Sequence, residues 1–272
     1  MVESFPLHLT DHFLFIGLGV VVPLLTALSH QPHDQRPTSP EQRRKLYANV
    51  MQGLWFLAAV VLVLWWWQDR PFSHLGLRWT PASLGPWSIG SAVVALLAYG
   101  LHLTFSMLSK SGRKSIEDQI SSMEVSIVPR DLRTFLHFIP LALSAAICEE
   151  IIFRGYLIGY LLSLLGEQPA AEALAIMIPA ICFTLGHIYQ SRKAMIQILV
   201  LSIFYGVFYL LTGSIYLLIL VHFLYNLMSG ITGLCFPEAP AAEEEGPQDG
   251  DEGRSGGDES HEPTGPEDDH KP

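Results

Sequence analysis

Long apolar runs, separated by short polar segments, fill most of the first 236 residues of this 272-residue chain. About 20 apolar residues in an α-helix are enough to cross about 30 Å of hydrocarbon. Seven stretches approach or exceed this length: 12–29, 49–67, 86–109, 135–165, 171–190, 194–212 and 214–234. The pattern predicts an all-α fold, a polytopic bundle of about seven transmembrane spans. The fourth stretch is too long for one straight span, so we expect an interfacial turn at Pro140 and a helix from about Leu141.

Charge divides the chain into two parts. Only 15% of all residues are charged, whereas a soluble domain carries about 25%. Residues 237–272 hold 13 acidic side chains and two basic ones, a net charge of −11 within a total of −10. We therefore expect a membrane-embedded domain over 1–236 and a disordered acidic tail over 237–272. Nothing in this composition points to nucleic-acid binding.

The connecting segments alternate in basic charge. Eleven basic residues lie in alternate segments on one side: Arg36, Arg43, Arg44, Lys45, Lys110, Arg113, Lys114, Arg130, Arg133, Arg192 and Lys193. The opposite side has only Arg70 and Arg78. Because basic segments stay on the cytoplasmic side, we expect an integral protein of the plasma or inner membrane. Its amino terminus would lie outside and its carboxyl terminus in the cytoplasm.

Three of the predicted spans carry polar residues in their interior. Such groups are costly in a bilayer, so each one points to a function. They are Glu149, Glu150 and Arg154 in the fourth span, Phe183 and His187 in the fifth, and His222 and Asn226 in the seventh. At about 1.5 Å per residue, Glu149, His187, His222 and Asn226 all fall in the cytoplasmic half. We expect three helices to project these four side chains into one cavity that opens to the cytosol.

The two adjacent glutamates have different expected roles. Glu150 and Arg154 are i and i+4 neighbours on a helix and form a natural ion pair, which also has a plain structural interpretation. Glu149 points about 100° away from Glu150 on an α-helix and is left for chemistry. His187 or His222 alone is equally consistent with a hydrogen-bonded core residue, and only their coincidence with Glu149 favours a functional role.

These residues form three motifs in a fixed order, EExxxR, FxxxH and HxxxN. They stand as Glu149 to Arg154, Phe183 to His187 and His222 to Asn226. This order resembles the CPBP intramembrane proteases, also called the CAAX protease and bacteriocin-processing or Abi family, over about residues 135–234. The resemblance implies a helical bundle around a cavity that admits a peptide and, in the CAAX enzymes, a prenyl group.

The resemblance also implies roles for the individual residues. In the family, the first glutamate and the second-motif histidine are thought to activate a water, and the third-motif pair to hold the oxyanion. Carried over, Glu149 is the general base assisted by His187, and His222 with Asn226 stabilises the tetrahedral intermediate. Phe183 is a candidate for lining the substrate cavity.

The metal requirement stays open at this point. The preferred mechanism needs no cofactor. The rival arrangement is a zinc site made by Glu149, His187 and His222, with a metal-bound water as nucleophile, although the chain has no HExxH helix.

The leading hypothesis is an intramembrane endopeptidase that acts on a membrane or lipidated peptide within the lipid bilayer. A non-catalytic immunity or scaffold protein on the same fold is one alternative. A proton-coupled transporter that uses the buried glutamate and histidines is another, but the sequence shows no inverted repeat of the kind many transporters have.

Overall fold

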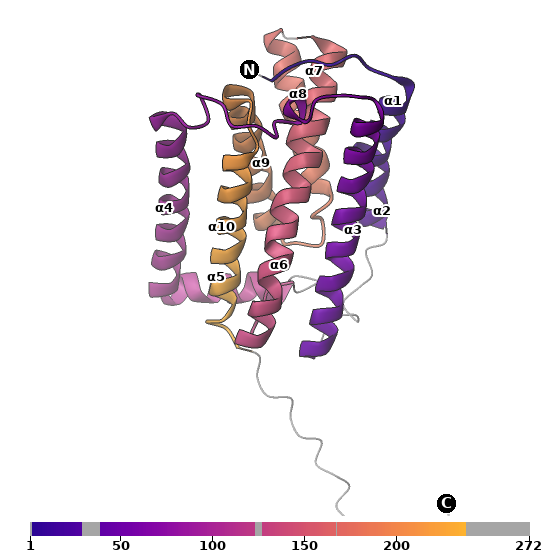
Figure 1. Ribbon diagram of the computed structural model, residues 1–272. Coiled ribbons are helices and arrows are strands. Elements are labelled where there is room, and N and C mark those ends of the chain that lie inside the picture. The colour runs from indigo at the N-terminus through magenta and orange to yellow at the C-terminus, as the bar shows by residue number, and fades with distance from the viewer. Residues whose placement is uncertain (1, 29–38, 123–126, 167, 238–272) are drawn as a thin grey trace, which may run out of the picture. The chain divides into compact units, whose positions relative to one another are not determined.

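The computed structural model describes residues 2–28, 39–122, 127–166 and 168–237, and its regular elements there are all helices. In chain order they are α1 (Leu9–Ile16), η1 (Gly17–Val21), α2 (Val22–Leu28), α3 (Pro40–Trp67), η2 (Phe72–Leu75), α4 (Pro86–Leu108), α5 (Lys110–Ser122), α6 (Leu132–Glu149), η3 (Glu150–Ile158), α7 (Gly159–Leu165), α8 (Pro169–Leu185), α9 (Arg192–Thr212) and α10 (Tyr216–Gly233). The long helices run side by side (Figure 1).

Six helices in the described ranges are long and apolar enough to cross a membrane. They are Leu9–Thr26, Pro40–Trp67, Pro86–Leu108, Leu132–Leu165, Arg192–Thr212 and Tyr216–Gly233. The shorter apolar helix α8 has 17 residues and corresponds to the remaining predicted stretch. The predicted fold class, a polytopic helical bundle in a membrane, is confirmed.

The central helix of the bundle is the continuous run α6–η3–α7. Half of its most apolar window is buried inside the protein, compared with 6% for α4. Every residue of η3 except Phe153 is buried. The motif with the two glutamates therefore lies where other helices surround it.

The expected turn at Pro140 is wrong, because α6 continues through this residue from Leu132 to Glu149. Proline removes one helical hydrogen bond, but packing on both sides of it holds the helix together. Phe138 and Leu141 are buried in one apolar cluster with Tyr47 of α3. Tight packing against neighbours is how membrane helices commonly accommodate a proline.

Two segments that were expected to be loops are helical. Helix α3 begins at Pro40, nine residues before the predicted start, and its first turn is capped by reciprocal hydrogen bonds between Ser39 and Gln42. Lys110 to Ser122 form the amphipathic helix α5, which lies across one end of the bundle (Figure 1). Residue 36 and the tail from residue 238 onward lie outside the described residues, so the prediction for the tail stays a prediction.

The amino-terminal segment is fixed to the opposite end of the bundle by a buried ion pair. Arg70 donates hydrogen bonds to both carboxylate oxygens of Asp11, at 2.8 and 2.7 Å. Its guanidinium also lies over the rings of Phe5 and Trp65. Tyr156 of η3 donates a hydrogen bond to the Asp11 carbonyl, which ties this anchor to the central helix.

Gly155, directly after the arginine of the first motif, is required by a close approach. A Cβ atom built at this position lies 2.6 Å from the carbonyl oxygen of Leu75 in η2. Real Cβ contacts are never that short, so any larger residue displaces the η2 segment. This contact explains why glycine stands at this place in the central helix.

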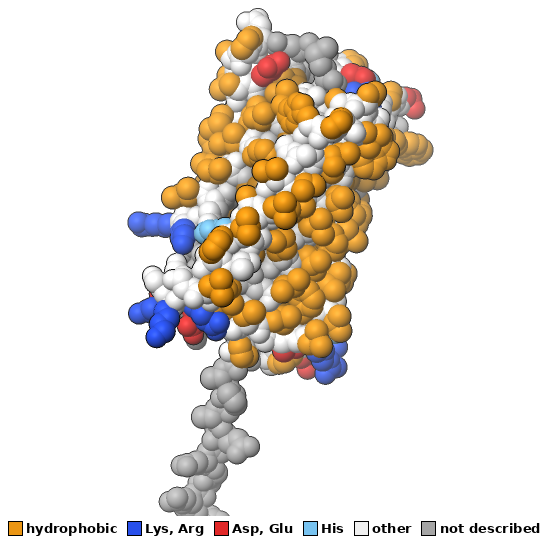
Figure 2. Space-filling model, turned by 90° about the vertical axis from the view of Figure 1, so that its left-hand side faces the viewer, with side chains coloured by type: hydrophobic (Ala, Val, Ile, Leu, Met, Phe, Trp, Pro, Cys, Tyr) orange, Lys and Arg blue, Asp and Glu red, His pale blue; other side chains and the backbone are white. Residues whose placement is uncertain are grey.

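The surface supports a membrane location. Figure 2 shows hydrophobic side chains over most of one face, with Lys and Arg gathered toward the end where α5 lies. Successive long helices run in opposite directions, so the start of α3, the helix α5 and the start of α9 lie at the same end of the bundle. These segments carry Arg43, Arg44 and Lys45, then Lys110, Arg113 and Lys114, and then Arg192 and Lys193. The protein is an integral membrane protein.

Candidate active site

The four predicted catalytic residues line one cavity of about 190 Å³. Glu149 comes from the last position of α6, His222 and Asn226 from α10, and His187 from the turn after α8. The rest of its lining includes apolar side chains of α3 and α6, Val50, Leu54, Phe138, Leu141 and Ala145. Reactive polar groups and apolar side chains in one hollow suit an amphiphilic chain.

The sequence had indicated that His187 lies on the fifth span, but helix α8 ends at Leu185, before this residue. The chain continues as a tight turn in which the His187 amide donates to the Thr184 carbonyl at 3.0 Å. The side chain keeps the one-turn relation to Phe183, since its Nδ1 lies 2.8 Å from the Phe183 carbonyl oxygen. A carbonyl only accepts, so Nδ1 carries the hydrogen and the neutral ring presents Nε2 as an acceptor.

A second cavity, of about 150 Å³, shares part of this lining. His187, His222 and Asn226 line both hollows, whereas Glu149 lines only the first. The other polar residues of the second cavity include Arg154 of η3 together with Ser202 and Tyr205 of α9. Three of the four candidate catalytic side chains therefore border both hollows.

Glu150 is at the centre of a buried polar network and is 0% exposed. Its Oε1 accepts from Arg154 at 3.2 Å, the predicted i and i+4 pair. The same oxygen lies 2.8 Å from Nδ1 of His222, a contact that the sequence did not reveal. Arg154 also donates to Ser202 Oγ at 3.0 Å. Glu150 therefore fixes two side chains from two different elements, and one of them is a candidate catalytic histidine.

Glu149 faces the other nitrogen of the same histidine. Its Oε2 lies 3.6 Å from Nε2 of His222, which is longer than a hydrogen bond. The Glu149 side chain is 13% exposed, whereas that of Glu150 is fully buried. The two glutamates thus differ in burial and in partners, but both converge on His222.

The convergence of adjacent glutamates coincides with a change of helix type. Residues Glu150–Ile158 form a π-helix, and Glu149 is the last residue of the preceding α-helix. A π-helix is wider than an α-helix, is rare, and is frequently found at functional sites. No residue pattern in the motif indicates it.

Phe183 packs beneath the arginine of the first motif. Its ring lies 5.1 Å from the Arg154 guanidinium carbon and 4.5 Å from the His187 ring. It lines the second cavity and is 8% exposed. The residue joins the first two motifs by a cation–π contact and a ring contact.

Helix α9 contributes site residues that sequence reasoning missed. Ser202 and Tyr205 lie one turn apart on it and belong to none of the three motifs. The Tyr205 ring lies 5.8 Å from the His222 ring, and its hydroxyl is buried without a hydrogen-bond partner, as is Oε2 of Glu150. Polar residues at helical spacing inside an apolar span were the available signal.

The rival zinc arrangement does not form in the described part of the chain. No group of three or more His, Cys, Asp or Glu side chains there is arranged to hold a metal ion. Glu149, His187 and His222 nevertheless line one cavity, and the metal requirement stays a prediction.

Comparison with known proteins gives one match. Residues 131–228 match the family model described as Rce1-like, type II CAAX prenyl endopeptidase. The comparisons with curated proteins and with solved structures gave no match. The matched segment runs from the residue before α6 to beyond Asn226 and includes all three motifs. The resemblance to the CPBP and CAAX protease family is therefore confirmed over this segment.

Proposed function

We propose that this protein is an intramembrane endopeptidase that uses Glu149 as its general base. The observation that carries the proposal is the single cavity lined by Glu149, His187, His222 and Asn226, with apolar side chains of α3 and α6 in the same lining. Three separate segments supply these side chains, and the match to a protease family spans all of them.

The proposed reaction begins with a water held between Glu149 and Nε2 of His187. Glu149 takes a proton from this water as its oxygen bonds to the carbonyl carbon of the scissile peptide, and the carbonyl π electrons move to the carbonyl oxygen. The resulting tetrahedral oxyanion then collapses, the C–N bond breaks, and the protonated Glu149 gives its proton to the departing nitrogen. Positioned acid–base groups of this kind typically contribute about 100- to 10,000-fold in rate.

Asn226 and His222 are the proposed donors to the oxyanion. The amide of Asn226 makes no hydrogen bond with a described residue, so both of its N–H groups are available. His222 has its Nδ1 occupied by Glu150, so its Nε2 donates only when the imidazole carries both protons. Donors that are already in place in a water-poor site can each contribute about 3 kcal/mol to a developing oxyanion.

The proposed substrate is a membrane or lipidated peptide that enters from the bilayer. The apolar lining of Val50, Leu54, Phe138 and Leu141 gives an apolar substituent a place beside the scissile bond. We propose further that the end of the bundle with α5 faces the cytoplasm, because its basic residues match the cytoplasmic bias of Lys and Arg. On this topology the amino terminus lies outside.

Purified full-length protein in detergent tests the proposal with a pair of peptides that differ only in a prenyl group on one cysteine. Cleavage of either peptide by the wild type, lost in Glu149→Gln and kept in Glu172→Gln, supports the proposal. Glu172 is an exposed glutamate of α8 and serves as the matched control. Activity that disappears with a chelator and returns with stoichiometric zinc would overturn the proposed metal-free step.

A further inference from the structure

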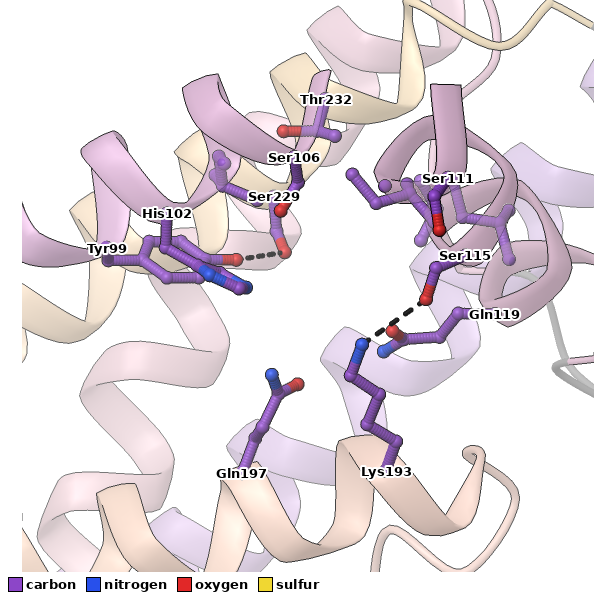
Figure 3. A pocket seen from close by; sticks show the side chains of 15 residues that line it. Tyr99, His102, Ser106, Ser111, Ser115, Gln119, Lys193, Gln197, Ser229 and Thr232 are labelled. Atoms are coloured by element: carbon purple, nitrogen blue, oxygen red, sulfur yellow. Dashed lines mark hydrogen bonds between the residues drawn. The ribbon is translucent and has the colours of Figure 1, made fainter. Parts of the chain in front are cut away.

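A further pocket lies outside the candidate site, at the end of the bundle where α5 lies. It encloses about 200 Å³. Figure 3 shows Tyr99 and His102 of α4 on one side, Lys193 and Gln197 rising from α9 on the other, and Ser115 and Gln119 of α5 closing one end. None of the four candidate catalytic residues lines it.

The pocket has the chemistry of an anion site. Among the described residues that line it, Lys193 is the one lysine or arginine, and none is an aspartate or glutamate. The Lys193 ammonium has a neutral partner, the Ser115 hydroxyl, at 3.3 Å. The remaining polar lining consists of neutral hydroxyl and amide groups, from Ser106, Ser111, Thr232, Gln119 and Gln197, beside His102. Glu117 and Asp118 of α5 are exposed but do not line the pocket.

The helix surface next to the pocket is apolar and exposed, which suits the acyl chain of a lipid. On α9 the side chains of Lys193, Gln197, Val200 and Phe204 follow one another at helical spacing, so a polar end continues into an apolar stripe. Val200 is 63% exposed in the isolated protein and, in a bilayer, faces acyl chains. The opposite helix α4 is likewise exposed, with only Ser88 and Ala92 buried.

Helices α4 and α9 meet at one end and stand apart at the other. Trp87, near the start of α4, contacts Phe208 of α9 with ring centroids 6.4 Å apart. At their other ends the two helices form opposite walls of the pocket, and Ser229 and Thr232 of α10 contribute to its lining (Figure 3). The two helices are therefore in contact at the end away from Lys193 and are separated by the pocket at the other.

We propose that this pocket binds the anionic head group of a membrane phospholipid, with the phosphate at Lys193 and an acyl chain along α9. A phosphate diester accepts hydrogen bonds from the ammonium, hydroxyl and amide groups present. A net anionic lipid is favoured over a zwitterionic one, because no described lining residue offers a carboxylate to a choline cation and Lys193 repels that cation. Ser229 also lines both cavities of the candidate site, so the bound lipid lies beside the site and occupies none of its candidate catalytic groups.

The test measures lipid retention by the full-length protein with native mass spectrometry. Phosphatidylglycerol and phosphatidylcholine with identical acyl chains are titrated against the wild type, Lys193→Gln and Arg192→Gln. Both cations are exposed and lie at the same end of α9, but only Lys193 lines the pocket. We expect the wild type to retain one phosphatidylglycerol at least about tenfold more tightly than phosphatidylcholine, and Lys193→Gln to lose this preference, as for a charge-assisted hydrogen bond. Arg192→Gln should keep it.

Three results would overturn the proposal. Equal retention of the two lipids by the wild type shows that no anionic head group is selected. Equal losses in Lys193→Gln and Arg192→Gln show only a general attraction of the basic surface. Displacement of the lipid by soluble glycerol phosphate at matched concentration shows a site for a free anion, with no contribution from the acyl chain. Melting curves of both variants check that each is folded.

Discussion

Changing each of the two adjacent glutamates to glutamine is expected to have a different effect: the first change lowers turnover, and the second lowers stability. Glu149→Gln preserves the size of the side chain but removes the proposed base. Because its approach to His222 is 3.6 Å, longer than a hydrogen bond, we expect a stability cost below about 1 kcal/mol. Turnover should fall at least about 100-fold, the lower range for a lost general base.

Glu150→Gln should act mainly on stability. It leaves Arg154, which is 2% exposed, without its carboxylate, and Ser202 becomes its remaining polar partner. Removing one member of a buried ion pair typically costs about 3 to 5 kcal/mol. At roughly 2 to 4 °C per kcal/mol for a protein of this size, the melting temperature should fall by about 6 to 20 °C. Activity should fall too, because the carboxylate that holds Nδ1 of His222 becomes a neutral amide, which accepts a weaker hydrogen bond.

The assay combines thermal melting in detergent with cleavage of the prenylated peptide, and Glu172→Gln serves as the exposed-glutamate control. Wild-type turnover in Glu149→Gln would refute the assignment of the base. Equal destabilisation by the two changes would show that Glu149 is a structural residue. A Glu150→Gln protein that melts like the wild type would contradict the role given to the buried network.

Three further predictions address the topology, the tail and the central helix. Cysteines placed at the exposed positions of Arg44 and Lys114, in a background lacking Cys235, should resist an impermeant thiol reagent in intact cells and react after lysis; labelling from outside would reverse the proposed orientation. A chain ending at Glu238 should retain peptidase activity, since all three motifs precede that residue; loss of activity with an unchanged melting temperature would give the tail a role at the site. Gly155→Ala should lower the melting temperature, because its methyl group collides with the Leu75 carbonyl; an unchanged melting curve would show that η2 shifts at no cost.

The sequence predicted the spans because the thickness of a bilayer imposes a length on every apolar helix. It did not predict where helices extend beyond the membrane. The polar residues from Glu41 to Lys45 break the apolar pattern, yet the cap made by Ser39 and Gln42 starts α3 before them. Helix α5 has no apolar run at all, and only its amphipathic pattern distinguishes it from a loop.

The candidate site was predictable where one helical turn separates two motif residues. Glu150 pairs with Arg154, and His187 stays in contact with the Phe183 backbone. The contact of His222 with Glu150 was not predictable, because it depends on how α10 packs against η3. A motif lists residues within one helix and contains no information on the packing of two.

The π-helix from Glu150 to Ile158 also changes which residues of the central helix share one face. A single helical wheel at 100° per residue, drawn from Leu132 to Leu165, assumes one winding throughout, whereas each π turn takes in an additional residue. Faces assigned from α6 therefore drift out of phase by the time the chain reaches α7. Spin labels, cross-linkers or photoreactive residues intended for one side of this helix need separate wheels before Glu150 and after Ile158.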